Sequence, residues 1–263
     1  MALIKTDFFS NKLKRAVSFY MCLPNDTPGG ADEKNYKTLY LLHGFYGAAA
    51  DWLMFSRVCD LSAQYNLAIV MPSGENSFFT DLKGTGGQFG QYVGVELVEY
   101  TRRTFALSAR RCDTFIAGLS MGGYGALRNG LLNAATFSKI AAFSCALIID
   151  DLKKLQKGQT AHIADYDFYE RCFGDLSQID KSMNDPRNII DNMQKEGRII
   201  PDIYLSCGDN DYLIEQNKDF MRFLTNRGVA FTFAGGEGQH NWAFWANALP
   251  GAIKWMLPDF REA

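Results

Sequence analysis

Ser120 lies in a five-residue segment with a glycine at each end, Gly118-Leu119-Ser120-Met121-Gly122. The apolar run at 114–117 before it predicts a buried strand, and the pattern at 124–132 after it predicts a helix. Such a short passage from strand to helix forces the serine into a sharp bend, with its hydroxyl exposed at the edge of the sheet. The segment therefore predicts a serine nucleophile. A glycine-rich turn with a helix-capping serine is the alternative interpretation.

A serine hydroxyl needs a neighbouring base to take its proton, and histidine suits that role near neutral pH. The chain has three histidines, His43, His162 and His240. Where a serine follows a strand in this way, the acid and then the histidine come later in the chain, which leaves His162 and His240. We expect His162 in an insertion and His240 on a loop after the last strand. His240 is therefore the predicted general base.

Two aspartates, Asp209 and Asp211, follow the strand expected at 202–206. A buried carboxylate beside the imidazole would hold its tautomer and stabilise the imidazolium that forms during attack. Spacing does not separate the two aspartates, and either can instead form a turn or cap a helix. We favour Asp211 and keep Asp209 as the alternative.

The segment His43-Gly44-Phe45-Tyr46-Gly47 follows the strand expected at 38–42. An acyl-transfer site needs two backbone N–H groups where negative charge develops on the substrate oxygen. The residue after the nucleophile, Met121, supplies one, and an early loop supplies the other. We therefore predict an oxyanion hole from the N–H groups of Phe45 and Met121. On its own, the His-Gly pair could equally be a turn that ends a strand.

These residues need a scaffold, and the hydrophobic pattern predicts one. Apolar runs alternate with helical patterns, which indicates a mostly parallel sheet with helices on both faces. At 263 residues, with 47% hydrophobic and 21% charged residues, the chain fits one large α/β domain. Strands are expected at 3–9, 16–23, 38–42, 67–71, 114–117, 139–144, 202–206 and 229–233, and helices at 52–64, 92–105 and 124–132.

Several segments outside these elements carry their own predictions. The first two strands are expected to form an antiparallel edge, with a polar turn region at 24–35. Residues 73–90 are rich in Gly, Ser and Asn and predict a long loop. The segment at about 145–200 is much longer than one crossover helix. We expect it to be a cap-like insertion over the carboxyl edge of the sheet, where such sheets bind ligands.

Composition argues against several classes of partner. The net charge of −2 and pI of about 5.9 give no basic field, so we expect no nucleic-acid partner. No stretch approaches the ~20 apolar residues that span a bilayer, and the N-terminus does not resemble a secretory signal. Six well-separated cysteines show no metal-ligand spacing and indicate reduced thiols and a cytoplasmic location. We expect neither a metal nor another cofactor.

The chain resembles the esterase D-like branch of the α/β-hydrolases, especially bacterial tributyrin esterases, over nearly its whole length. The serine segment is the most specific part of the match. The matching segments are Leu41-Leu42-His43-Gly44, Phe79-Thr80-Asp81, Phe115 to Gly125, Phe173-Gly174, Cys207-Gly208-Asp209-Asn210-Asp211-Tyr212-Leu213, and His240-Asn241-Trp242 with Trp245. The resemblance implies an α/β-hydrolase fold.

This resemblance also implies an activity. It implies a serine carboxylesterase that hydrolyses short-chain acyl esters, including acetyl groups on carbohydrates, without a cofactor and often as a dimer or tetramer. It favours Asp211 over Asp209, because the acid of the family directly precedes an aromatic-Leu pair. The same branch contains S-formylglutathione hydrolases, feruloyl esterases and acyltransferases, which remain alternatives. A non-catalytic binding protein is disfavoured by the intact Ser, Asp and His.

Specificity is harder to predict from sequence. We expect Trp52, Phe79, Tyr166 and Trp242 to contact the substrate, although each aromatic ring fits core packing equally well. Cys145 stands where relatives tend to carry a small residue. It either narrows the acyl pocket, places a thiol nearby, or simply packs as a small hydrophobe.

Overall fold

The computed structural model describes residues 1–25 and 35–260 of the chain. Within these ranges the main sheet has eight strands in the order β1-β2-β4-β3-β5-β6-β9-β10. Strands β1 and β2 are antiparallel to each other, β2 is antiparallel to β4, and the remaining neighbours are parallel. The strands are β1 (Ala2–Ser10), β2 (Arg15–Leu23), β3 (Lys37–Leu42), β4 (Leu67–Pro72), β5 (Thr114–Leu119), β6 (Lys139–Phe143), β9 (Asp202–Gly208) and β10 (Phe231–Gly236). The predicted mostly parallel sheet with an antiparallel edge is confirmed.

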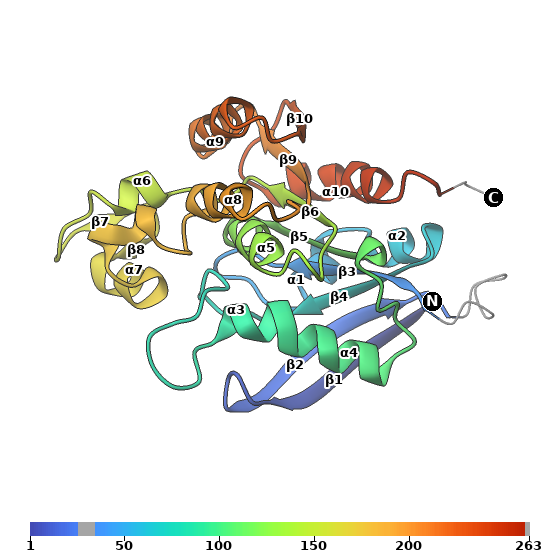
Figure 1. Ribbon diagram of the computed structural model, residues 1–263. Coiled ribbons are helices and arrows are strands. Elements are labelled where there is room, and N and C mark those ends of the chain that lie inside the picture. Colours follow the sequence, from blue (N-terminus) through green and yellow to red (C-terminus); the bar gives the residue numbers. More distant parts are fainter. Residues whose placement is uncertain (26–34, 261–263) are drawn as a thin grey trace.

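Helices cover both faces of this sheet, as Figure 1 shows. One face packs against α1 (Asp51–Phe55), α2 (Val58–Gln64) and α10 (Trp242–Met256). The other face packs against α3 (Phe89–Gln91), a π-helical segment (Tyr92–Glu96), α4 (Leu97–Thr104), α5 (Met121–Leu132) and α9 (Ile214–Asn226). Helix α8 (Pro186–Lys195) joins the same apolar cluster by packing against α5. Strands β3 to β6 are buried almost throughout, because both of their faces are covered. The predicted α/β-hydrolase architecture is confirmed.

Several element boundaries differ from the prediction by one to three residues, and in two elements the difference has a clear cause. The helix expected at 52–64 is two helices, because Ser56 is extended and its hydroxyl donates to the Trp52 carbonyl, which ends α1. The last strand begins at Phe231 rather than Val229, since the Val229 N–H donates to the Leu224 carbonyl and still closes α9.

The polar region predicted at 24–35 mostly lies outside the described residues. The turn that joins β1 to β2 is instead formed by residues 11–14.

The segment between β6 and β9 contains several short elements. They are α6 (Ile149–Leu152), β7 (Thr160–Ala161), β8 (Ala164–Asp165), α7 (Tyr166–Phe173), a 3₁₀ turn (Leu176–Lys181) and α8. Strands β7 and β8 form a separate two-stranded hairpin, which lies with α6 and α7 at one end of the molecule (Figure 1). Helix α8 differs from the others because it packs against α5 beside the main sheet.

Candidate active site

Ser120 occupies the bend between β5 and α5, with φ 54° and ψ −118°. Gly118 and Gly122, two residues before and two residues after it, have no room for a side chain. A Cβ on Gly118 would lie 2.3 Å from the Gly122 carbonyl oxygen, and a Cβ on Gly122 would lie 2.4 Å from the His43 carbonyl oxygen. Backbone atoms cannot give way to such contacts. The sequence pattern therefore holds Ser120 in a left-handed conformation at the carboxyl end of β5.

The three residues predicted to form a catalytic triad lie within hydrogen-bond distance of one another. Ser120 Oγ is 2.9 Å from His240 Nε2, and His240 Nδ1 is 3.0 Å from each carboxylate oxygen of Asp211. Asp211 follows β9 and His240 follows β10. Because a carboxylate only accepts hydrogen bonds, Nδ1 carries the imidazole hydrogen and Nε2 is free to accept from the serine hydroxyl. Asp209, the alternative acid, is exposed, and the hydrogen bonds of His240 Nδ1 go to Asp211 instead.

The Asp211 carboxylate is buried, and its surroundings keep it ionised. Burial raises the pKa of Asp211, but hydrogen bonds from His240, the Ser144 hydroxyl and the Leu213 N–H together lower it below its usual range. Trp245 Nε1 donates to Ser144 Oγ at 2.9 Å and so holds that hydroxyl in place. Sequence reasoning missed the role of Ser144, which carries no local motif.

The loop after β3 brings a second set of groups to Ser120. His43 is buried, and its Nε2 accepts a hydrogen bond from the Gly74 N–H at 2.9 Å. Nδ1 therefore carries the hydrogen and donates to the Gly44 carbonyl at 2.7 Å. The Gly47 N–H donates to the same oxygen. These two hydrogen bonds fix the peptide plane between Gly44 and Phe45.

The two predicted oxyanion donors, the N–H groups of Phe45 and Met121, belong to two segments that meet at Ser120. The Gly44–Phe45 peptide is trans, so the Phe45 N–H points away from the anchored Gly44 carbonyl. Gly44 itself lies against the nucleophile, since a Cβ built on it would be 3.6 Å from Ser120 Cβ. Met121 is the first residue of α5, where a backbone N–H has no partner within the helix. Both segments that carry the predicted donors therefore adjoin Ser120.

A small cavity opens beside Ser120. Its volume is about 20 Å³, close to the space that one water molecule needs. The inner wall is apolar and buried, and the outer rim is exposed. The inner residues are Phe78, Met121, Ala146, Ile148 and Leu213, and the rim residues are His162, Ile163 and Tyr212. The Tyr212 ring also packs on the His240 imidazole, with centroids 4.5 Å apart.

The aromatic residues expected to bind substrate lie elsewhere. Trp52 and Phe79 are fully buried: Trp52 donates to the Leu42 carbonyl, and Phe79 packs against His43. Trp242 packs against Trp52, and the Tyr166 hydroxyl contacts Glu170 on α7. None of the four lines the cavity beside Ser120. Phe78, which sequence reasoning passed over, lines it.

Cys145 is fully buried next to the nucleophile bend and does not line the described cavity. Burial raises the pKa of its thiol well above the usual value, so the side chain stays a neutral thiol. This environment matches packing as a small hydrophobe.

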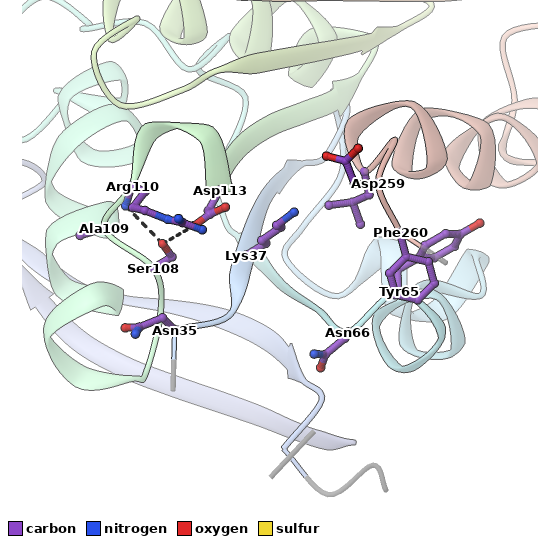
Figure 2. A pocket seen from close by; sticks show the side chains of 11 residues that line it. Asn35, Lys37, Tyr65, Asn66, Ser108, Ala109, Arg110, Asp113, Asp259 and Phe260 are labelled. Carbon is purple, nitrogen blue, oxygen red and sulfur yellow. Dashed lines mark hydrogen bonds and ion pairs between the residues drawn. The ribbon is translucent and has the colours of Figure 1, made fainter. Parts of the chain in front are cut away.

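A larger hollow, with a volume of about 800 Å³, is lined by Lys37, Ser108, Arg110 and Asp113 among others. Figure 2 shows these side chains. It adjoins the amino ends of β3 and β5, opposite the end of the sheet that carries Ser120. Three of its polar side chains pair with one another, because Arg110 and Ser108 both donate to Asp113. We therefore do not assign this hollow as the reactive site, although it is larger than the cavity beside Ser120.

Among the residues that the structure describes, no cluster of three or more His, Cys, Asp and Glu side chains is arranged to hold a metal ion. No helix in the described ranges is both long and apolar enough to cross a bilayer.

A family model described as "Putative esterase" matches residues 10–256 of the chain. The chain belongs to this putative esterase family. An acetyl esterase from Caldicellulosiruptor saccharolyticus is 41% identical over 261 residues, which is 97% of this chain and 98% of the relative. The predicted resemblance to esterases of this branch is confirmed.

Solved structures of similar proteins agree with the family. The fluorophosphonate-binding serine hydrolase FphF of Staphylococcus aureus superimposes with a TM-score of 0.87 at 28% identity, covering 98% of this chain and 99% of that one. The S-formylglutathione hydrolase FrmB of the same organism gives 0.84 at 28% identity, covering 97% and 98%. A ferulic acid esterase at 21% identity and a TM-score of 0.80 shares the fold. The chain is therefore a carboxylic ester hydrolase of the serine esterase type, as predicted, and acts on small-molecule esters.

Proposed function

We propose that this esterase cleaves short-chain acyl esters, with acetyl esters as preferred substrates, through an acyl-enzyme on Ser120. The observation that carries the acyl preference is the cavity of about 20 Å³ beside Ser120. Its buried apolar wall suits a methyl group, and a longer chain would need side chains to move. The 41% identical relative bears the name acetyl esterase.

In the proposed mechanism Ser120 Oγ attacks the ester carbonyl while His240 Nε2 takes its proton. Asp211 holds the imidazole and stabilises its positive charge. The N–H groups of Phe45 and Met121 donate to the oxyanion as it forms. His240 then protonates the departing alcohol, and a water molecule activated by the same imidazole attacks the acyl-enzyme and releases the acid.

A series of p-nitrophenyl esters tests the acyl preference. We expect kcat/KM to be highest for acetyl, lower for butyryl, and at least 10-fold lower for octanoyl, because each methylene without space forces repacking. The preference is wrong if octanoyl ester is cleaved as fast as acetyl ester. A feruloyl ester belongs in the same series, since its cinnamoyl group exceeds the cavity by far.

Thioester hydrolysis of S-formylglutathione is the second candidate. A formyl group is smaller than acetyl and fits the same cavity, and FrmB of S. aureus is 28% identical. Comparing kcat/KM for S-formylglutathione and for an acetyl ester separates the two. Acyl transfer shares every step up to the acyl-enzyme, so product analysis with and without an added alcohol acceptor tests it.

Three broader features remain proposals. We propose a single α/β-hydrolase domain over residues 1–263, with a cap-like insertion at about 145–200. We also keep a cytoplasmic location and a homo-oligomer, a dimer or tetramer, as proposals. Fractionation of cells tests the location, and light scattering after size-exclusion chromatography tests the oligomeric state.

A further inference from the structure

His162 stands at the rim of the cavity that contains Ser120, although it is distant from the triad in sequence. It lies in the two-residue turn between β7 and β8, with a φ of 52°. Histidine is one of the few non-glycine types enriched at positive φ. Its side chain is 20% exposed, so the imidazole is partly buried, and it lines the cavity.

Neighbouring elements hold this turn in place. Tyr169 of α7 is buried, and its hydroxyl donates to the Ala161 carbonyl at 3.0 Å, directly before His162. His162 Nε2 lies 3.0 Å from Asp151 Oδ2 on α6. Gln216 of α9 donates to the same carboxylate oxygen at 3.4 Å. The imidazole is therefore positioned by three separate elements.

The hydrogen bond to Asp151 engages Nε2 and leaves Nδ1 available to a ligand. A carboxylate only accepts, so Nε2 of the neutral ring carries the hydrogen. Nδ1 then offers an acceptor lone pair, and no hydrogen bond to Nδ1 occurs among the described residues. A hydroxyl group can donate to Nδ1 of the neutral ring and can accept from it if the ring is protonated.

The residues that line the cavity fall into two groups. The inner wall is apolar and buried, and it suits the acyl group of the proposed substrate. The rim carries His162, Ile163 and Tyr212, of which Ile163 is 38% and Tyr212 59% exposed. With the acyl group inside, we expect the alcohol part of the ester to extend toward this rim, where His162 lies.

We propose that His162 determines specificity for the alcohol part of the ester, by accepting a hydrogen bond at Nδ1 from a second hydroxyl of a polyol or sugar. Asp151 is a positioning residue that fixes the ring. This inference rests on the proposed function of the Ser120 site, and it adds the class of alcohol that the site accepts.

The test compares two acetate esters that share the acyl group and the carbon chain, 1-acetylglycerol and propyl acetate. The readout is kcat/KM for 1-acetylglycerol divided by kcat/KM for propyl acetate. Differences in folding or in acyl binding affect both esters alike and do not change this ratio. We expect His162→Phe to lower the ratio about 3- to 10-fold, the value of one hydrogen bond. His162→Asn, which tolerates positive φ and keeps a polar atom near the Nδ1 position, should restore most of it.

Two further variants complete the design. Asp151→Ala should lower the ratio in the same direction, and it supplies the same test if His162→Phe does not fold. Thr160→Val is the matched control, because Thr160 is an exposed residue of the same hairpin outside the cavity lining, and it should keep the wild-type ratio. A ratio within twofold of wild type in both His162→Phe and Asp151→Ala overturns the inference. Since both esters carry acetyl, a failed acyl preference would appear in the p-nitrophenyl series and not here.

Discussion

His43 and Gly44, two neighbours in sequence, are joined by a hydrogen bond from the imidazole Nδ1 to the carbonyl oxygen, at 2.7 Å. The donor is fixed because Nε2 of the same ring accepts from the Gly74 N–H. The peptide that this bond anchors also contains the Phe45 N–H, the proposed oxyanion donor. A buried side chain thus positions the backbone group that we propose donates to the oxyanion.

Variants of His43 should separate its two hydrogen bonds. His43→Asn keeps a donor near the Nδ1 position, His43→Gln keeps an acceptor near Nε2, and His43→Phe keeps neither. Losing one oxyanion donor typically costs 10²–10³ in kcat, so we expect a fall of about 10- to 100-fold for His43→Phe and a smaller one for His43→Asn. Steady-state kinetics with p-nitrophenyl acetate measure this, and KM should change little. Equal kcat values for Asn and Phe would contradict the role of the Gly44 bond.

The same histidine should make stability depend on pH. Burial lowers the pKa of His43, although its bond to Gly44 and the nearby Asp51 carboxylate raise it in part. Below about pH 6.5 the unfolded chain then binds a proton that the folded chain does not. The contribution of neutral His43 is complete above that pH and is lost as the pH falls.

Urea unfolding at pH 7.5 and 5.5 measures this effect. The free energy of unfolding of the wild type should decrease over that interval by more than that of His43→Asn, up to about 1.4 kcal/mol per pH unit. An equal decrease in both proteins would show that other groups cause the pH dependence.

The choice of Asp211 over Asp209 as the catalytic acid can be tested by comparing variants of the two aspartates. Asp211 is buried against His240, whereas Asp209 is exposed. Asp211→Asn should lower kcat by about 10³–10⁴-fold, because the amide favours the wrong imidazole tautomer, and Asp209→Asn should leave kcat within about twofold. Kinetics of both variants, with circular dichroism to confirm folding, decide the matter. A larger loss in Asp209→Asn would reverse the assignment.

Replacing the nucleophile tests the mechanism itself. Ser120→Ala and His240→Ala should each lower kcat by about 10⁴–10⁶-fold, and the double variant should lose little more, since the two residues act as a unit. A fluorophosphonate probe should label the wild type and not Ser120→Ala. Near-normal turnover of p-nitrophenyl acetate by Ser120→Ala would refute the assignment.

The proposed triad was predictable because it depends on a local glycine pattern and on the order of its residues along the chain. Gly118 and Gly122 restrict the backbone around Ser120, and the chain order Ser, Asp, His follows from the order of the strands. The sheet itself was predictable from its apolar runs, since strands covered on both faces exclude polar residues. These features need no knowledge of distant contacts.

The lining of the cavity beside Ser120 was not predictable in this way. Trp52 and Phe78 are both aromatic and both buried, yet only Phe78 lines the cavity. Phe78 and the adjacent Phe79 both have positive φ, and no sequence periodicity tells which ring faces Ser120. The position of His162 depends on the β7–β8 hairpin, which contacts Tyr169 and Asp151. Tertiary contacts decide each of these orientations.

The cavity wall should control acyl length. Ile148 lines the inner wall and is 3% exposed. Ile148→Ala removes three carbons there, so we expect the butyryl-to-acetyl ratio of kcat/KM to rise about 10-fold, as one or two extra methylenes find space. Stability should fall by about 2–5 kcal/mol, and Ile148→Val should show a smaller change in both quantities. An unchanged ratio would place the acyl group elsewhere.

Replacing Gly122 should disrupt the site, for a steric reason that does not apply to Gly251, another glycine within a helix. A Cβ on Gly122 would lie 2.4 Å from the His43 oxygen and 2.7 Å from the Leu42 oxygen, both backbone atoms, whereas one on Gly251 of α10 would meet only the Tyr204 hydroxyl at 3.4 Å. Alanine favours a helix over glycine by about 1 kcal/mol at either position. Gly251→Ala should therefore keep activity and match or raise the wild-type Tm. In Gly122→Ala the clash pushes α5 away from β3, so Tm should fall by several degrees and kcat/KM at least 100-fold. Wild-type Tm and kinetics in Gly122→Ala would mean that the bend at Ser120 tolerates displacement.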